Sequence, residues 1–286
     1  MVTRIILILS AGVAIAGGLA ACGGGSARGE AGGGRLEVVA GLYPLAYAAE
    51  QIGGDRVHVR NLIPPGTEPH DFELSPRDVE AVRSADLVLY LGQGFQPALE
   101  DAVVSVGVRS ADLLEGLPLR GKDPHVWLDP LLYAQMVERI ANELGRPQAA
   151  AGLLLELRAL DDEYRRGLGS CERRAIVTSH EAFAYLADRY GLEQISVAGL
   201  SPEAEPAPKD LARVVEQVRE SGGTTIFTEP LVSPRIADTV AREAGVETAV
   251  LNPIEGLTED EVASGADYFS LMRENLAALR KGLACR

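Results

Sequence analysis

Three of the four histidines in this chain lie in short, distinctive motifs. His70 lies in residues 67–72 (Thr-Glu-Pro-His-Asp-Phe), His125 in residues 123–130 (Asp-Pro-His-Val-Trp-Leu-Asp-Pro) and His180 in residues 177–183 (Val-Thr-Ser-His-Glu-Ala-Phe). Neutral imidazole is the commonest protein ligand for transition metals. Three imidazoles and one carboxylate would complete a four-coordinate zinc site. The sequence therefore predicts a metal centre, provided that the three motifs meet in the folded chain.

Strands and helices alternate through the first part of the chain. The sequence predicts strands over residues 36–42, 57–63 and 85–91, and helices over residues 45–52 and 75–84. Ser75 is suited to cap the second helix, and Pro76 is suited to its first position. Residues 92–122 are harder to interpret, so no element is predicted there.

The alternation resumes after the middle of the chain. Helices are predicted over residues 130–144 and 149–168, and the second is long and amphipathic. Strands over residues 175–178, 224–228 and 248–251 then alternate with helices over residues 182–190, 209–220, 234–244 and 267–282. This order predicts an α/β fold with mostly parallel sheets. We expect an N-terminal lobe (35–145), a linking helix (146–170) and a C-terminal lobe (171–286), with a ligand site between the lobes.

The predicted elements place the histidines favourably for such a site. His180 comes directly after a predicted strand, and His70 follows another through a Pro-rich loop. Ligands of α/β proteins bind at the ends of strands. His125 precedes the helix over residues 130–144, so its position is less defined. Two of these histidines come from the first lobe and one from the second.

The N-terminus reads as an export segment. Arg4 precedes an apolar run over residues 5–15, and Leu-Ala-Ala-Cys follows at residues 19–22. This pattern is typical of a signal peptide over residues 1–21, and it resembles a lipobox in which Cys22 is lipidated. The alternative is an ordinary signal peptide with an unrelated cysteine. Residues 23–34 are rich in Gly and predict a flexible tether. The protein is therefore expected on the extracytoplasmic face of a membrane, held by lipid.

The net charge of the chain argues against one class of partner, and its cysteines suggest a disulfide. The 286 residues are 47% hydrophobic and carry a formal net charge of −14, which argues against nucleic acid as a partner. Besides Cys22, the chain has Cys171 and Cys285. In an oxidising compartment these two are expected to form a disulfide, although two separate buried thiols are the alternative.

The three histidine motifs together resemble the metal-binding solute receptors of bacterial ABC importers, which handle zinc or manganese. The resemblance covers about residues 36–284 and rests on residues 64–71, 123–130 and 179–183. It implies two α/β lobes joined by one long helix, with the metal between them. It also implies delivery of the metal to an ABC permease in the membrane. The chain has no histidine between His70 and His125, so it lacks the His-rich loop of many zinc receptors.

The resemblance also suggests the fourth ligand. Residues 252–258 (Asn-Pro-Ile-Glu-Gly-Leu-Thr) are similar to the segment from which zinc-type members supply a glutamate, so we expect Glu255. Glu229, at another strand end, is its rival, and a water molecule is the third option. Manganese receptors of this kind tend to have a carboxylate where this chain has His180. Three imidazoles and one carboxylate suit zinc better than manganese, which prefers oxygen.

Other residues near the motifs are weaker candidates for a role at the metal site. Asp71, Asp123 and Glu181 either orient the imidazoles or serve as caps and surface groups. His58 is expected at the surface. Two aromatic residues of the motifs, Trp127 and Phe183, are expected to pack in the core.

Two other functions compete with a metal receptor. Three histidines with an open fourth position would activate water in a zinc hydrolase, but the chain has no His-Glu-x-x-His helix. A surface adhesin is a further alternative, for which the sequence offers no distinct module. We therefore expect a binding protein with zinc as its transported ligand, not an enzyme, and a manganese receptor as the nearest alternative.

Overall fold

The computed structural model describes residues 34–202 and 206–286, and residues Arg35–Arg286 form one compact unit. The predicted signal peptide, Cys22 and all but the last residue of the tether lie outside the described residues. In the described part of the chain, no helix is both long and apolar enough to cross a membrane.

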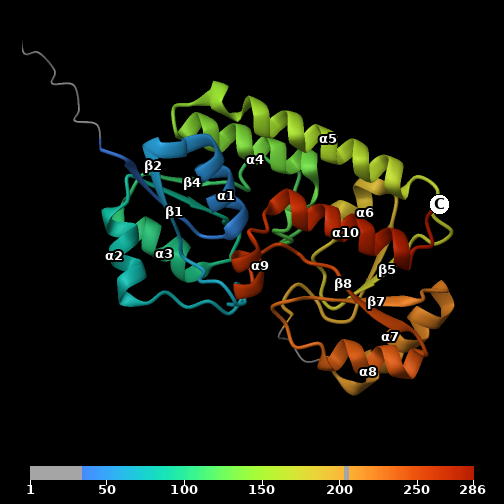
Figure 1. Ribbon diagram of the computed structural model, residues 1–286. Coiled ribbons are helices and arrows are strands. Elements are labelled where there is room, and N and C mark those ends of the chain that lie inside the picture. Colours follow the sequence, from blue (N-terminus) through green and yellow to red (C-terminus); the bar gives the residue numbers. More distant parts are fainter. Residues whose placement is uncertain (1–33, 203–205) are drawn as a thin grey trace, which may run out of the picture. The chain divides into compact units, whose positions relative to one another are not determined.

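Two four-stranded parallel sheets form the framework of this unit (Figure 1). The first has the order β2-β1-β3-β4, built from β1 (Leu36–Ala40), β2 (Val57–Asn61), β3 (Leu87–Tyr90) and β4 (Ser110–Asp112). The second has the order β6-β5-β7-β8, built from β5 (Ala175–Thr178), β6 (Glu193–Ser196), β7 (Thr225–Thr228) and β8 (Glu247–Val250). Every strand pair in both sheets is parallel. The predicted α/β class with two mostly parallel sheets is confirmed.

Helices connect the strands. Around the first sheet lie α1 (Tyr43–Gly53), α2 (Pro76–Ser84), α3 (Pro97–Val106) and α4 (Pro130–Glu143). Around the second lie α6 (Ala184–Tyr190), α7 (Pro208–Ser221) and α8 (Arg235–Ala244). The short helix α9 (Glu259–Ser264) follows β8 in the chain. Short 3-10 turns are η1 (Gly54–Arg56), η2 (Val126–Leu128) and η3 (Pro147–Ala150).

The long mid-chain helix predicted from the sequence is α5 (Ala151–Leu168). It lies between the two sheets in sequence and within the predicted linking segment. It packs against α4 and against the last helix, α10 (Tyr268–Gly282). The lobe boundaries at residues 145 and 171 stay a prediction.

The start of α2 illustrates how local chemistry sets these elements. Ser75 caps the helix by accepting a hydrogen bond from the backbone N–H of Asp78, and the Asp78 side chain accepts one from the backbone of Ser75. Pro76 fills the first helical position, where no backbone donor is needed. The predicted cap and first residue of this helix are confirmed.

The structure adds elements that the sequence did not predict. The unassigned residues 92–122 contain α3 and the three-residue strand β4. The edge strand β6 and the short helix α9 were also missed. Both β4 and β6 are short and largely polar, so they lack the apolar pattern by which strands are recognised.

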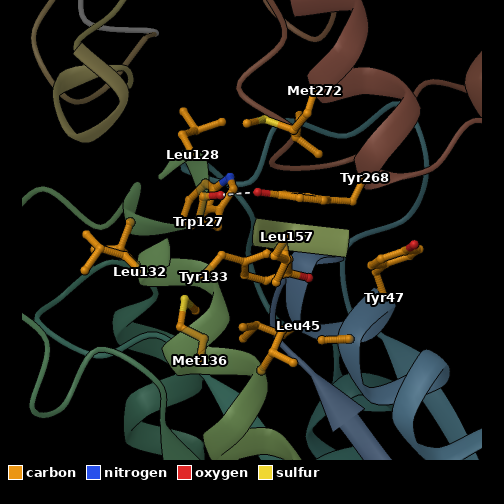
Figure 2. Close-up of a cluster of buried hydrophobic side chains, with 14 of the residues drawn as sticks. Leu45, Tyr47, Trp127, Leu128, Leu132, Tyr133, Met136, Leu157, Tyr268 and Met272 are labelled. Carbon is orange, nitrogen blue, oxygen red and sulfur yellow. Dashed lines mark hydrogen bonds between the residues drawn. The ribbon is translucent and has the colours of Figure 1, made fainter. Parts of the chain in front are cut away.

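One hydrophobic cluster extends across the parts of the unit that carry the two sheets. Figure 2 shows its centre, where Trp127, Tyr133 and Tyr268 pack together. The rings of Tyr133 and Tyr268 lie 4.4 Å apart, and the Tyr268 hydroxyl donates a hydrogen bond of 2.6 Å to the backbone oxygen of Trp127. Trp127 lies in η2, two residues after His125. The helix α10 and the segment that carries His125 therefore share one hydrophobic core.

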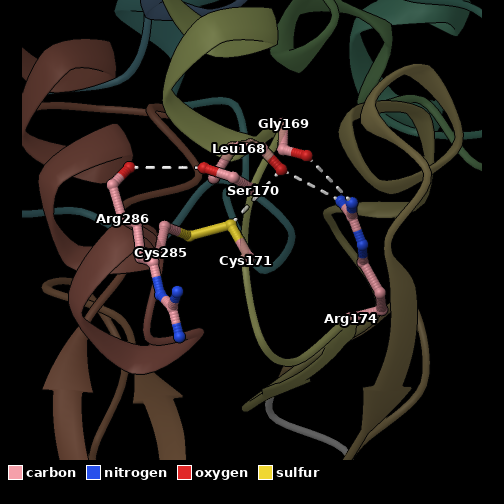
Figure 3. The surroundings of a disulfide bond; sticks show 7 residues. All are labelled: Leu168, Gly169, Ser170, Cys171, Arg174, Cys285 and Arg286. Carbon is pink, nitrogen blue, oxygen red and sulfur yellow. Dashed lines mark hydrogen bonds between the residues drawn. A yellow bond between two sulfur atoms is a disulfide. The ribbon is translucent and has the colours of Figure 1, made fainter.

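A disulfide joins Cys171, just after α5, to Cys285 at the end of the chain (Figure 3). The backbone N–H of Arg286 donates to the oxygen of Ser170 beside it, at 3.2 Å. The predicted pairing of these two cysteines is confirmed. It closes a loop across 114 residues of sequence.

Candidate metal centre

The four predicted ligands meet at one point. One donor atom from each of His70, His125, His180 and Glu255 can be chosen so that all four lie within 4.8 Å of one another. The Nε2 atom of His125 lies 2.8 Å from Oε1 of Glu255, and those of His70 and His180 each lie 3.4 Å from the same oxygen. This group of three imidazoles and one carboxylate has the composition of a four-coordinate zinc site.

Different elements supply the four side chains. His70 lies on the segment between β2 and α2, and His125 immediately precedes η2. His180 follows β5, and Glu255 follows β8. The carboxyl ends of parallel strands are where α/β sheets hold ligands. Because the segments after these strands meet, His70 and Glu255 contact each other although they are 185 residues apart in sequence.

Access to the cluster is uneven. The side chains of His125 and His180 are fully buried and that of Glu255 is 3% exposed, whereas that of His70 is 11% exposed. A surface cavity of about 330 Å³ opens beside His70, and Phe95 and Lys122 also line it. Solvent therefore reaches the cluster from the side of His70.

Charge is concentrated within the cluster. Burial alone would raise the pKa of Glu255, but hydrogen bonds from the histidines hold it well below its usual value. Burial alone would lower the pKa of His180, yet Glu229 and Glu255 raise it to about 10. The pKa of His125 is also raised, because Asp123 and Glu255 outweigh its burial. His125 and His180 therefore hold a proton more strongly than a free imidazole does.

Comparison with known proteins identifies the family. Residues 38–282 match the family described as ZnuA, the periplasmic component A of the zinc-uptake complex. The chain belongs to this zinc-uptake family. The family consists of uptake components and not enzymes, so the hydrolase hypothesis is set aside.

Individual relatives agree with this family. The chain is 34% identical over 298 residues to the high-affinity zinc uptake system protein ZnuA of Bacillus subtilis, with 93% of each chain covered. It is 36% identical over 279 residues to the zinc-binding lipoprotein AdcA of Streptococcus pneumoniae, which covers 87% of this chain. The match spans only 56% of that AdcA protein, so the chain corresponds to about half its length.

Solved structures have the same architecture. The Zn(II)-bound ZnuA-like domain of S. pneumoniae AdcA matches with a TM-score of 0.77 and 35% identity, covering 87% of this chain and 99% of that one. The laminin-binding protein Lmb of Streptococcus agalactiae, described as bifunctional with adhesin and metal-transporting activity, matches with a TM-score of 0.80 and 31% identity, at the same coverage.

The rival ligand Glu229 lies behind the cluster. Its Oε2 atom is 2.6 Å from Nδ1 of His180, the ring nitrogen that points away from Glu255. Asp123 has a similar place behind His125, with its Oδ1 atom 2.6 Å from Nδ1. The structure therefore brings Glu255, and not Glu229, into the group of four.

The remaining sequence candidates are not members of the group of four. Asp71 and Glu181 are exposed. His58 is exposed, as expected for a surface residue. Trp127 and Phe183 are fully buried, as expected for packing residues.

Sequence reasoning missed the residues that hold the Glu255 segment. Ile254 has φ +57°, a left-handed conformation that is unusual for a β-branched residue. The Asn275 side chain both accepts from the backbone N–H of Asn252 at 2.7 Å and donates to its oxygen at 2.6 Å. The Asn-Pro pair at residues 252–253 is a sequence signal typical of a turn, whereas nothing in the sequence points to Asn275.

Proposed function

We propose that this protein is an extracytoplasmic receptor that captures zinc and delivers it to an ABC-type importer. The observation that carries the proposal is the convergence of three imidazole nitrogens and one carboxylate oxygen, all within 4.8 Å. A protein carboxylate in the fourth position closes the coordination shell, which suits reversible capture of an ion better than activation of a water molecule.

We assign His70, His125, His180 and Glu255 as the zinc ligands. Nitrogen-rich coordination favours zinc over manganese, which prefers more oxygen. The zinc-binding and zinc-uptake relatives support the same metal. The ion is the transported ligand of this protein, so it must bind tightly and still leave.

The ligand assignment is tested with alanine variants of the purified protein. Zinc affinity is measured by competition with a chelator of known strength. His125→Ala and His180→Ala are expected to lose more than about 100-fold in affinity, exceeding the effect of changing residues that only support a ligand. His58→Ala is the matched control, because His58 is exposed and outside the cluster. Unchanged affinity in the ligand variants would overturn the assignment.

Manganese is tested in the same competition assay. We expect much weaker manganese binding, because manganese prefers more oxygen ligands than this site provides. Metal analysis of the protein as purified provides a second measurement, and manganese as its major metal would contradict the proposal.

The anchor and the transport partner complete the proposal. Cys22 is the proposed site of lipidation, and Cys22→Ser is expected to move the protein from the membrane fraction to the soluble fraction. The permease is tested by growth under zinc limitation. A strain lacking this protein should be restored by the unaltered chain and not by His180→Ala.

A further inference from the structure

Two buried carboxylates contact the outer nitrogens of two proposed zinc ligands. Oδ1 of Asp123 lies 2.6 Å from Nδ1 of His125, and Oε2 of Glu229 lies 2.6 Å from Nδ1 of His180. Asp123 is 4% exposed and Glu229 is 6% exposed. Facing lone pairs repel at this distance, so each close pair is stable only if one of its two atoms carries a proton.

We propose that Asp123 and Glu229 are positioning residues that keep the proton on Nδ1 and so leave Nε2 of each ring free to bind zinc. This inference rests on the proposed zinc function. Positions 123 and 229 should also differ in how well they tolerate replacement of the carboxylate by an amide side chain. The difference follows from the donors that surround each carboxylate.

Three groups approach the two oxygens of Glu229, and two of them donate hydrogen bonds. Oε1 accepts from the hydroxyl of Ser179 and from the backbone N–H of His180, at 3.2 Å for the latter. Oε2 faces Nδ1 of His180; the N–H direction is bent away from it, but neither atom has another hydrogen-bond partner among the described residues. Both oxygens of Glu229 must therefore act as acceptors.

A glutamine at position 229 cannot meet this requirement. If its oxygen replaces Oε1, its NH₂ group faces Nδ1 of His180, which must then accept and transfer its proton to Nε2. That tautomer has no lone pair on Nε2 for zinc. If its oxygen replaces Oε2, the NH₂ group meets the backbone N–H of His180, and two donors oppose each other.

Asp123 uses a single oxygen for both of its contacts. Its Oδ1 atom accepts from the backbone N–H of His125 at 3.0 Å as well as from Nδ1. Its Oδ2 atom is buried and has no hydrogen-bond partner among the described residues. An asparagine with its oxygen in the Oδ1 position keeps both contacts and loses only the charge.

The test compares Glu229→Gln with Asp123→Asn in the purified full chain. Zinc affinity is measured by chelator competition, and the melting temperature of the metal-free protein reports on folding. We expect Glu229→Gln to lose about 10–100-fold in affinity and Asp123→Asn to lose less than about 10-fold. Equal losses, or unchanged affinity in Glu229→Gln, would overturn the inference.

A second readout separates positioning from general stability. The visible spectrum of the Co²⁺-loaded protein reports the ligand geometry. It should change in Glu229→Gln and remain that of the unaltered protein in Asp123→Asn. A folded Glu229→Gln protein with an unaltered spectrum would contradict the positioning role.

A measurement on the unaltered protein needs no variant to fold. Nitrogen-15 NMR of the zinc-loaded chain should show protonated Nδ1 and metal-bound Nε2 for His125 and His180. Metal-bound Nδ1 at either residue overturns the inference. If the unaltered chain and the His58→Ala control both fail to bind zinc, the proposed function itself fails, which is a different outcome.

Discussion

Zinc binding to this site is expected to release protons, and the number follows from the metal-free cluster. The pKa of His180 is raised to about 10: burial lowers it, but Glu229 and Glu255 outweigh burial. The pKa of His125 is raised in the same way by Asp123 and Glu255. Zinc binds only a deprotonated imidazole nitrogen. At pH 7, His180 must therefore lose a proton when zinc binds.

At pH 7, the binding of each zinc ion should release about one to two protons. His180 contributes close to one, because pH 7 lies far below its pKa of about 10. His125 contributes the remainder. The logarithm of the zinc affinity should therefore rise by at least about one unit for each unit of pH between about 6.5 and 8.5.

Calorimetry in buffers of different ionisation enthalpy measures these protons directly. The apparent binding enthalpy should change linearly with the buffer enthalpy, and the slope gives the proton number. Glu255→Gln should reduce the slope, because Glu255 raises the pKa of both His125 and His180. An enthalpy that is the same in every buffer, together with an affinity independent of pH, would refute the reasoning.

The same pKa shift predicts how the stability of the metal-free protein depends on pH. The folded-state pKa of His180 lies above its ordinary value of 6.5. Its contribution to stability is therefore fully present below pH 6.5 and is lost as the pH rises toward about 10. The melting temperature of the metal-free protein should fall over this range, and a rise would contradict the sign of the shift.

Three further predictions concern the residues that hold the framework. Replacing Cys171 and Cys285 by Ser opens a loop of 114 residues, and the entropic model gives a loss of about 5 kcal/mol, measurable by calorimetry. Trp127→Phe keeps an aromatic ring, although a smaller one, and leaves the backbone oxygen of Pro253 without its donor, at a cost of at least about 1–3 kcal/mol in urea unfolding. Asn275→Ala removes two hydrogen bonds to the backbone of Asn252, at about 1–3 kcal/mol each, and should also weaken zinc binding.

Much of the fold could be predicted because its signals are local. The cap at Ser75 and the proline at position 76 specify the start of α2 without reference to the rest of the chain. The core strands β1, β3 and β5 are mostly apolar. The edge strands β4 and β6 are held mainly by backbone pairing with a neighbour. That pairing is tertiary, so their short polar sequences gave no signal.

The residues of the candidate site also differ in whether a local pattern or the folded structure identifies them. The histidines could be chosen from their motifs, because each motif is a local pattern. The choice between Glu255 and Glu229 depends on which ring nitrogen of His180 each carboxylate faces. Both glutamates follow strands of the second sheet, so strand position did not distinguish them. Only the folded chain places one on Nε2 and the other on Nδ1.

The support for the site comes from the core and not from the ligands alone. Trp127 links the His125 segment to Pro253, two residues before Glu255, because its indole N–H donates a hydrogen bond of 2.8 Å to the backbone oxygen of Pro253. Tyr268 of α10 in turn donates to the backbone of Trp127. Two ligands that are 130 residues apart in sequence are thus held by one buried cluster. None of these contacts involves the ion, so they hold the two segments together independently of zinc and reduce the entropic cost of binding it.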